Sequence, residues 1–380
     1  METKKYRFDE VTINFDKKRI PLSSAQREKR QGTFRYYGAQ GVIDHVDDYI
    51  FDGTYLLIAE DGENLKSKKQ NIAQVVDGQF WVNNHAHIVQ GNEQCDTRFL
   101  CYLINSMDLS GYVTGSAQPK LSQANLNAVT LSLPTLAEQK RIVEYLYMLD
   151  QKIDVNRQIN DNLEQQAQSY FQELFVDNAD PEWTTGSISD LGVVVGGSTP
   201  SKAKPEYYTE SGIAWITPKD LSINKSKFIS HGENDITELG LKNSSATIMP
   251  EGTVLFSSRA PIGYIAIAAG EVTTNQGFKS VVPKPEIGTP FVYFFLKHNL
   301  PIIEGMASGS TFKEVSGSTM KNIPAVIPDA DTLGRFNDFC APIFAQQRIL
   351  EEECQSLAAL RDNLLPKLMS GEIDVSDIQL

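Results

Sequence analysis

The chain contains an internal repeat, in which a segment near residue 115 recurs 194 residues later. The stretch GSAQPKLSQANLNAVTLSLP at 115–134 aligns with GSTFKEVSGSTMKNIPAVIP at 309–328, and four of the twenty positions are identical. Apolar residues also coincide, for example Leu121 with Val315. The same offset continues without a gap through the segment that follows. A chain with such a repeat is expected to form two related units with approximate two-fold symmetry.

The segment after each repeat carries seam residues at alternating spacings of four and three. This heptad pattern predicts a long helix with one packing seam. The first seam comprises Ile142, Leu146, Leu149, Ile153, Asn156, Asn160, Leu163, Ala167, Tyr170 and Leu174. The second comprises Phe336, Cys340, Ile343, Gln347, Leu350, Cys354, Leu357, Arg361, Leu364 and Leu368. Two copies in phase favour mutual coiled-coil packing over two amphipathic helices that each pack on their own domain.

Capping signals indicate where the two helices begin. Thr135 followed by Glu138 forms a capping box, and Asp329 stands at the equivalent place before the second helix. Each seam then spans about 50 Å at roughly 1.5 Å per residue. Polar seam residues such as Asn156 and Arg361 weaken the packing but can fix its register.

The rest of each half is rich in predicted strands and turns. Strands are expected in 54–62 and 253–268, short helices in 99–105 and 291–297, and an equivalent pair of segments at 83–89 (NNHAHIV) and 274–282 (TNQGFKSVV). The order is therefore globular unit, long helix, globular unit, long helix. The expected boundaries are 1–133, 134–176, 177–328 and 329–380.

The net charge of −13 argues against a nucleic-acid binder if it is taken alone, because phosphate contacts need Lys and Arg. The excess is unevenly distributed. Residues 134–176 and 331–380 together carry −8, whereas residues 1–133 carry only −1. The two globular units can therefore still present basic faces.

Polar and basic residues gather at turn positions in both globular units. Arg, Lys, Asn and Gln can contact base edges, and Ser, Thr and Lys suit phosphates. The alternative is an ordinary solvated loop surface, but clusters at matching places in both halves favour DNA contact. The candidates are Asn84, His85, Ser116, Gln118 and Lys120 in the first unit, and Thr199, Lys202, Lys219, Arg259, Asn275, Gln276, Lys279, Ser310, Thr311 and Lys313 in the second.

No motif for catalysis or metal binding stands out. The glycine-rich stretch at 193–202 lacks the pattern of a P-loop or a dinucleotide site, and no GxSxG, HExxH or methyltransferase NPPY-type run is present. His85 and His87 have no third ligand at useful spacing, so hydrogen bonding within the turn or contact with a nucleic acid is expected instead of a metal site. The four cysteines form no CxxC pair and are expected to be reduced thiols.

Segments throughout the sequence resemble those of a known protein family. Residues 133–175 (LPTLAEQKRIVEYLYMLDQKIDVNRQINDNLEQQAQSYFQELF) are similar to the central conserved region of type I restriction–modification specificity subunits. Residues 196–222 and 251–284 resemble the opening and the middle of that family's target-recognition domain, and LLPKLMSGEI at 364–373 resembles its C-terminal conserved end. The resemblance covers nearly the whole chain.

The resemblance implies an α+β protein with two α/β target-recognition domains, separated by two long antiparallel coiled-coil helices and related by a pseudo-two-fold axis. Each domain reads one half of a bipartite site in double-stranded DNA, and the helices set the spacer. Two methyltransferase subunits dock on the chain, and restriction–translocation subunits can join. The chain itself has no cofactor, since S-adenosylmethionine, ATP and Mg²⁺ bind to the partners. Residues 1–52 lack the pattern GGSTPS…WITPKDLS of the second unit, so an asymmetric target is expected.

Two other classes of protein stay open from the sequence. One is a restriction enzyme or methyltransferase with its own catalytic site, and the other is a coiled-coil scaffold without a DNA role. The longest apolar runs are far shorter than the roughly 20 residues of a membrane span, and the first residues lack a signal-peptide pattern. No membrane association and a cytoplasmic location are expected.

Overall fold

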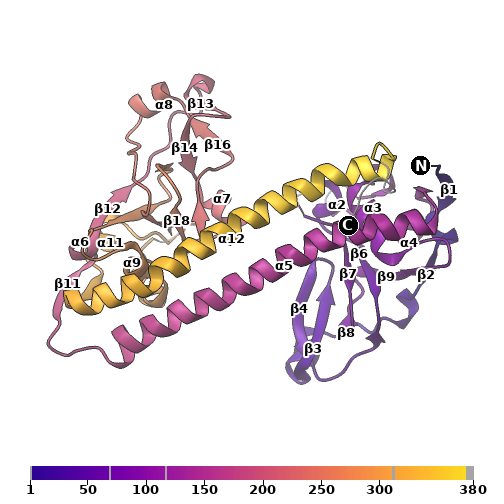
Figure 1. Cartoon of the computed structure of the whole chain (residues 1–380), viewed down its shortest axis with the longest axis horizontal. Coiled ribbons are helices and arrows are strands. Elements are labelled where there is room, and N and C mark those ends of the chain that lie inside the picture. The colour runs from indigo at the N-terminus through magenta and orange to yellow at the C-terminus, as the bar shows by residue number, and fades with distance from the viewer. Residues whose placement is uncertain (1, 68–69, 116–117, 310–312, 374–380) are drawn as a thin grey trace. The chain divides into compact units, whose positions relative to one another are not determined.

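The computed structural model describes residues 2–67, 70–115, 118–309 and 313–373. The chain divides into two compact units. The first combines Met1–Ile153 with Ser356–Leu380, and the second is Asp154–Gln355. Both units mix helices and strands (Figure 1), which confirms the predicted α+β class.

The first unit contains two four-stranded sheets and a short ribbon. One sheet has the order β2 (Thr12–Asn14), β9 (Ala86–Gly91), β6 (Tyr55–Ala59) and β7 (Ala73–Val76). The other has the order β4 (Gly41–Val46), β3 (Gln31–Gly38), β8 (Gln79–Val82) and β5 (Phe51–Asp52). The ribbon pairs β1 (Lys4–Arg7) with β10 (Thr130–Leu133). The helices are α1 (Ser24–Glu28), α2 (Asn64–Ser67), α3 (Thr97–Ser106) and α4 (Gln123–Asn127).

Helix α3 covers the first of these sheets. Asp96 caps it by accepting hydrogen bonds from the backbone N–H groups of Arg98 and Phe99. Its apolar face buries Phe99 and Leu103 against strand residues such as Leu56. The predicted helix at 99–105 is therefore confirmed, and it joins β6 and β9 into one core.

The second unit has a five-stranded sheet and a four-stranded sheet. The five-stranded order is β12 (Gly192–Gly196), β20 (Lys279–Pro283), β17 (Val254–Ser258), β18 (Ile262–Ala268) and β15 (Phe228–Ile229). The four-stranded order is β13 (Tyr208–Thr209), β16 (Asn234–Ile236), β14 (Ile213–Ile216) and β19 (Thr273–Thr274). A ribbon pairs β11 (Thr184–Ser187) with β21 (Pro324–Ile327). The short helices are α6 (Ile188–Leu191), α7 (Pro218–Ile223), α8 (Glu238–Lys242), α9 (Thr289–His298), α10 (Leu300–Gly305) and α11 (Gly317–Lys321).

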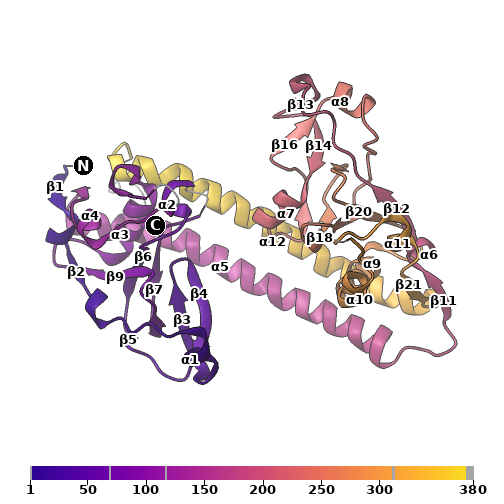
Figure 2. The ribbon, with the colours of Figure 1, turned by 180° about the vertical axis from the view of Figure 1, so that it is seen from behind.

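The two units repeat the same order of elements, as the sequence repeat predicts. In both, a ribbon joins the start of the unit to the strand before the long helix (β1 with β10, β11 with β21). The run β2–β9–β6 corresponds to β12–β20–β17. The helix pair α3 and α4 corresponds to α9 and α11, and Figure 2 shows these elements within each unit.

Two long helices, α5 (Leu136–Gln172) and α12 (Ala330–Ser370), begin where the capping signals predict. The Thr135 hydroxyl donates to a carboxylate oxygen of Glu138 at 2.7 Å, and Asp329 accepts the backbone N–H of Thr332 at 2.8 Å. A π-helical turn at Glu173–Asp177 follows α5. All twenty predicted seam residues are buried or half-buried.

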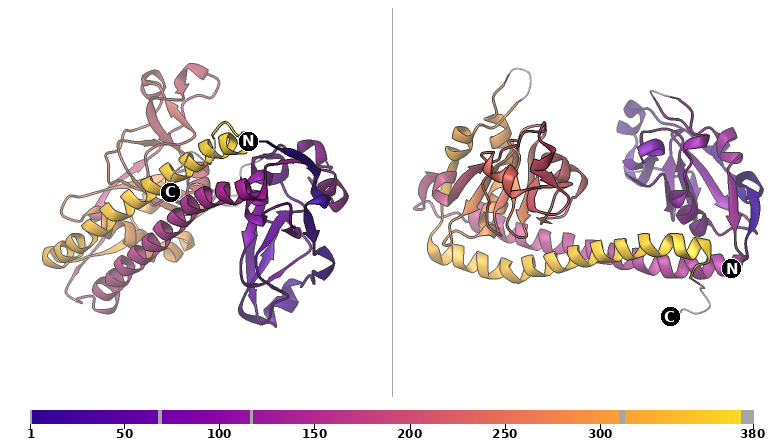
Figure 3. Two further views of the ribbon diagram at one scale, coloured as in Figure 1. Left: turned by 45° about the vertical axis from the view of Figure 1, so that its right-hand side comes forward. Right: turned by 90° about the horizontal axis from the view of Figure 1, so that it is seen from above.

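Each unit contains one stretch of both helices, and within it the helices lie side by side. In the second unit, Asn156 donates to Glu353 at 2.7 Å, Gln347 donates to the Asn160 carbonyl at 3.2 Å, and the ring of Tyr170 lies 4.6 Å from that of Phe339. Higher numbers on α5 meet lower numbers on α12, so the pair is antiparallel there (Figure 3). In the first unit, Leu146 and Leu368 share one hydrophobic core.

Candidate nucleic-acid interface

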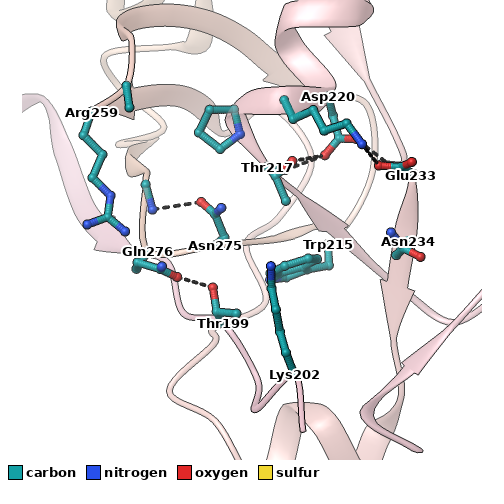
Figure 4. A pocket seen from close by; sticks show the side chains of 14 residues that line it. Thr199, Lys202, Trp215, Thr217, Asp220, Glu233, Asn234, Arg259, Asn275 and Gln276 are labelled. Carbon is teal, nitrogen blue, oxygen red and sulfur yellow. Dashed lines mark hydrogen bonds and ion pairs between the residues drawn. The ribbon is translucent and has the colours of Figure 1, made fainter. Parts of the chain in front are cut away.

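A pocket of about 470 Å³ in the second unit is lined by predicted contact residues. They come from loops and from the short helix α7, and Figure 4 shows them around one opening. The sequence alone does not place these residues together, because they are spread over nearly eighty positions of the chain. The predicted residues that line the pocket are Thr199, Lys202, Lys219, Arg259, Asn275 and Gln276.

The turn after β19 forms one edge of this pocket. The Asn275 backbone N–H donates to the Ile216 carbonyl at 3.0 Å, and its side-chain oxygen accepts the Gly277 N–H at 2.8 Å. A Cβ at Gly277 would lie 2.9 Å from that oxygen and 3.0 Å from Pro218, so the turn leaves no room for a side chain. The turn therefore presents Gln276 outward, where its side-chain oxygen accepts a hydrogen bond from the Thr199 hydroxyl (Figure 4).

A tryptophan supports the wall of the pocket. Trp215 is 6% exposed, and its indole N–H donates to the Ser198 carbonyl at 3.0 Å. The ring of Tyr208 packs edge-on against it at 5.6 Å. Because the indole is bonded on its polar side and packed on its apolar side, the wall is a fixed surface beside the Asn275–Gly277 turn.

The cations around the pocket differ in how freely they face solvent. Lys219 forms an exposed ion pair with Glu233. Lys279 is only 15% exposed and lies 3.5 Å from Glu314. Arg259 is 37% exposed and 3.7 Å from the other oxygen of Glu314, so its guanidinium keeps donors that face solvent.

The first unit carries two of its candidates on a corresponding turn between β8 and β9, and two more in the loop that ends at Lys120. Asn84 and His85 are exposed there. The His85 ring nitrogen Nδ1 lies 2.8 Å from an Asp61 carboxylate oxygen. Lys120 is 53% exposed and lies 3.2 Å from Glu60. Gln118 is exposed in the loop that mutual backbone hydrogen bonds between Thr114 and Lys120 close at 2.8 Å.

His87 has a structural role, unlike its exposed neighbour His85. It is 1% exposed, with Nδ1 2.7 Å from Asp16 and Nε2 2.8 Å from the Leu121 carbonyl. Both ring nitrogens must donate to these acceptors, so the imidazole is protonated. Burial opposes this charge, but the hydrogen bonds to Asp16 and the Leu121 carbonyl outweigh burial and raise the pKa of His87. The hydrogen bonds expected within the turn are made instead to segments 71 and 34 positions away in the chain, and a side chain buried in this way does not contact a nucleic acid.

Three of the predicted residues, Ser116, Ser310 and Thr311, lie outside the described residues. Lys313, the first described residue after 310–312, is exposed. Within the predicted pair of segments, 83–89 and 274–282, the structure places Asn83 at the position of Asn275, because the two asparagines make the same hydrogen bonds.

The comparison with known families decides between the classes of protein that the sequence leaves open. The model of the type I restriction modification DNA specificity domain matches residues 2–165 and 181–351. The chain belongs to this family of DNA specificity subunits. The matched model describes a DNA-recognition domain and not a catalytic one, in line with the expectation of a non-catalytic chain.

Named relatives agree with this family. The MjaIX specificity subunit of Methanocaldococcus jannaschii is 39% identical over 191 residues, which cover 48% of this chain and 44% of that protein. This match thus spans less than half of that relative's length. The HindI specificity subunit of Haemophilus influenzae is 24% identical, over 85% of this chain and 84% of the relative.

A solved structure has the same fold as this specificity-family chain. It is the crystal structure of a type I restriction–modification S subunit from M. genitalium, with a TM-score of 0.59 and 16% sequence identity. The match covers 97% of this chain and 96% of that one. At this identity the likeness concerns the fold alone.

The second unit of the specificity chain also contains a buried charged network that the sequence analysis missed. Lys227 is 6% exposed on its side chain, and its Nζ lies 2.7 Å from Glu164 on α5 and 2.8 Å from Gln347 on α12. Lys297 on α9 lies 2.6 Å from the other oxygen of Glu164. The ammonium of Lys227 also sits over the Phe344 ring, 3.4 Å from its centroid.

The pKa values of two groups in this network, Lys227 and Glu164, are shifted by their surroundings. Burial lowers the pKa of Lys227 to about 8, against the opposing effect of the Glu164 carboxylate. Burial of Glu164 favours its neutral form, but the Lys227 and Lys297 ammonium groups outweigh burial and lower its pKa to about 2. Lys227, which directly precedes β15, is thereby joined to both long helices, by an ion pair with Glu164 on α5 and a hydrogen bond to Gln347 on α12. Lys227 carried no sequence signal, because its partners lie 63 and 120 positions away.

In the described part of the chain, no three His, Cys, Asp or Glu side chains gather in an arrangement that could hold a metal ion. Cys95, Cys101, Cys340 and Cys354 are free thiols. Of the helices within the described ranges, none combines the length and the apolar character that crossing a bilayer requires.

Proposed function

We propose that this chain selects the DNA sequence on which a type I restriction–modification complex acts. Each unit reads one half of a bipartite target in double-stranded DNA. The observation that carries this proposal is the presence of the same polar turn in both units, at Asn83–His85 and at Asn275–Gly277, beside different charged residues. The same scaffold with different side chains suits the reading of two different half-sites, so the target is asymmetric.

The chemical type of each described candidate residue indicates whether it would contact a base or a phosphate. Amide and guanidinium groups suit base edges, while lysines and hydroxyls suit phosphates. The proposed contacts are Asn84, His85, Gln118 and Lys120 in the first unit, and Thr199, Lys202, Lys219, Arg259, Gln276, Lys279 and Lys313 in the second, whereas the predicted contact Asn275 shapes the turn that carries Gln276.

The two long helices would set the gap between the half-sites. A seam of about 50 Å corresponds to roughly 14 base pairs, which is an upper limit on the separation. Coiled-coil packing along both helices is part of this proposal. The residues proposed to maintain it are Leu146, Leu149, Ile153, Asn156, Asn160, Leu163, Tyr170 and Leu174 on α5, and Phe336, Ile343, Leu350, Leu357, Leu364 and Leu368 on α12.

Partner subunits would supply what this chain lacks. Relatives are named as specificity subunits of type I restriction enzymes. We therefore assign two methyltransferase subunits, and restriction–translocation subunits where present, as partners that carry S-adenosylmethionine, ATP and Mg²⁺. Exposed apolar side chains on α5, such as Val155 at 48% and Ile159 at 42%, support docking of a partner on the helices. A cytoplasmic location belongs to the same proposal.

The acidic character of the chain has a consequence for its affinity for DNA. With a net charge of −13, the isolated chain should bind DNA weakly, and basic partners should supply part of the phosphate contacts. The test is to measure methyl transfer to host DNA by the methyltransferase subunits with and without this chain, and DNA affinity of the chain with and without those subunits. Methylation that does not need the chain, methylation by the chain alone, or equal affinity of chain and complex would contradict the proposal.

A further inference from the structure

The turn that lines the pocket of the second unit is present in the first unit with the same hydrogen bonds. The Asn83 backbone N–H donates to the Tyr37 carbonyl at 3.0 Å, as that of Asn275 donates to the Ile216 carbonyl at 3.0 Å. Each asparagine oxygen then accepts the backbone N–H two residues later at 2.8 Å. In both units the turn follows one strand of a parallel pair. It follows β8, which pairs with β3, in the first unit, and β19, which pairs with β14, in the second.

The neighbours of the turn are equivalent as well. The Glu60 N–H donates to the carbonyl of His85 at 2.9 Å, and the Ser258 N–H donates to the carbonyl of Gly277 at 2.7 Å. On the far side, the carbonyl of Glu60 accepts from Leu121, and that of Ser258 accepts from Val315. These matches place Asn84 and Gln276 at the same position, at the tip of each turn.

Both tip residues are primary amides that face solvent. Gln276 accepts the Thr199 hydroxyl through its oxygen, which fixes the amide and leaves its N–H₂ group directed away from that bond (Figure 4). Asn84 is held through its backbone, whose carbonyl lies 3.4 Å from the Arg19 guanidinium. An amide presents one donor and one acceptor side by side, which matches N7 and the N6 amino group of adenine in the major groove.

We propose that Asn84 and Gln276 are specificity-determining residues that each read one adenine, in the first and second half-site respectively. The inference rests on the proposed function and names the base that the site takes. Asn83 and Asn275 are positioning residues, since their side chains are buried or half-buried and each accepts a hydrogen bond within the turn. The shared tip thus gives the two half-sites one A·T position in common, while the residues around it differ.

The experiment is a map of modified bases in a host strain that lacks the gene, complemented with single variants. Wild type is expected to restore one gapped, two-part motif. Gln276→Ala is expected to lose the requirement for adenine at one position of one half-site, with discrimination reduced about 5- to 150-fold. Asn84→Ala is expected to do the same in the other half-site. Asn243→Ala and Gln123→Ala replace exposed amides elsewhere in the same units and should leave the motif unchanged.

Isosteric variants keep the inference testable if an alanine variant does not fold. Gln276→Glu and Asn84→Asp preserve shape but remove the donor that adenine N7 needs, so each should also lose adenine at its own half-site. An unchanged motif, a change at a G·C position, or loss of both half-sites in a variant that melts at the wild-type temperature would overturn the inference. Failure of wild type to restore any motif would instead overturn the proposed function.

Discussion

Asp61 in the first unit and Arg259 in the second occupy the same place in their folds. Through its backbone, each forms an isolated antiparallel β-bridge with a residue that closes a later loop. This residue is Lys120 in the first unit and Glu314 in the second. The charges of the two pairs are therefore inverted. Arg259 can donate two hydrogen bonds to the O6 and N7 atoms of guanine, and Asp61 can only accept hydrogen bonds.

This inversion predicts the effect of exchanging the pair. Arg259→Asp combined with Glu314→Lys gives the second unit the charges of the first, and opposite charges still face each other. We expect the modified motif to change at one G·C position of the second half-site, with melting temperature close to wild type. The matched exchange, Asp61→Arg with Lys120→Glu, should change only the first half-site. Base-modification maps of the two strains check both results, and a motif unaltered by either exchange would contradict them.

The buried pair of His87 and Asp16 predicts a pH-dependent contribution to stability. The pKa of His87 is raised, so its contribution is complete below the unfolded value of about 6.5 and is lost as pH rises through the folded value. The pKa of Asp16 is lowered, so its contribution is present above about 3.9 and is lost as pH falls through its folded value.

The stabilisation by this pair is therefore largest between the two unfolded pKa values, from about pH 3.9 to about pH 6.5. His87→Gln should reduce the free energy of unfolding by about 3 kcal/mol near pH 6, because it leaves the Asp16 carboxylate buried with fewer partners. The difference from wild type should shrink as pH rises from about 6.5 through the raised folded pKa of His87. Urea unfolding at a series of pH values measures this, with exposed His45→Gln as the control. A loss that does not vary with pH would show that His87 acts through packing alone.

The charged network around Glu164 predicts that breaking it also reduces the free energy of unfolding, here in the second unit. Glu164→Gln leaves Lys227 and Lys297 without their carboxylate, and we expect unfolding to require about 3 kcal/mol less. Glu144→Gln changes an exposed residue of the same helix and should stay within about 0.5 kcal/mol of wild type.

A second substitution separates the charge effect from packing. Lys227→Met in the Glu164→Gln chain removes the stranded buried charge, so part of the lost stability should return. Chemical denaturation of wild type, the single variants Glu164→Gln and Lys227→Met, and the double variant gives the coupling energy between the two positions. Strictly additive losses would argue that the ion pair of Lys227 with Glu164 does not hold the start of β15 against α5.

The spacer role of the helices predicts the result of lengthening them. One heptad is inserted after Ile153 in α5 and one after Gln355 in α12, at the boundary between the two units. Seven residues add about 10 Å to each helix, so the gap between half-sites should grow by roughly three base pairs. The bases read in each half-site should not change, and a map in which they do would rule out the spacer role.

The sequence predicted the features that depend on local periodicity. The seams of α5 and α12, their capping residues and the helices α3 and α9 follow from the spacing of apolar residues along one segment. The repeat also predicted the common order of strands. These features could be read because each is encoded within a short stretch of chain.

The features that depend on distant contacts could not be read in this way. The equivalence of Asn83 with Asn275 has an offset of 192, whereas the helices have an offset of 194, and the strand pairing and the hydrogen bonds of the turn reveal it. The pocket around Gln276 gathers residues from several loops. Likewise, nothing in the sequence around Lys227 indicates that it is buried. Its ion pair with Glu164 and its hydrogen bond to Gln347 form only in the folded chain.

The most direct test of the central claim is a map of modified bases in the host genome, with this gene intact and with it deleted. We predict that one gapped, two-part and non-palindromic motif is modified in the intact strain and loses its modification on deletion. A genome whose modified motifs are the same in both strains would contradict the assignment of this chain as the subunit that selects the DNA sequence.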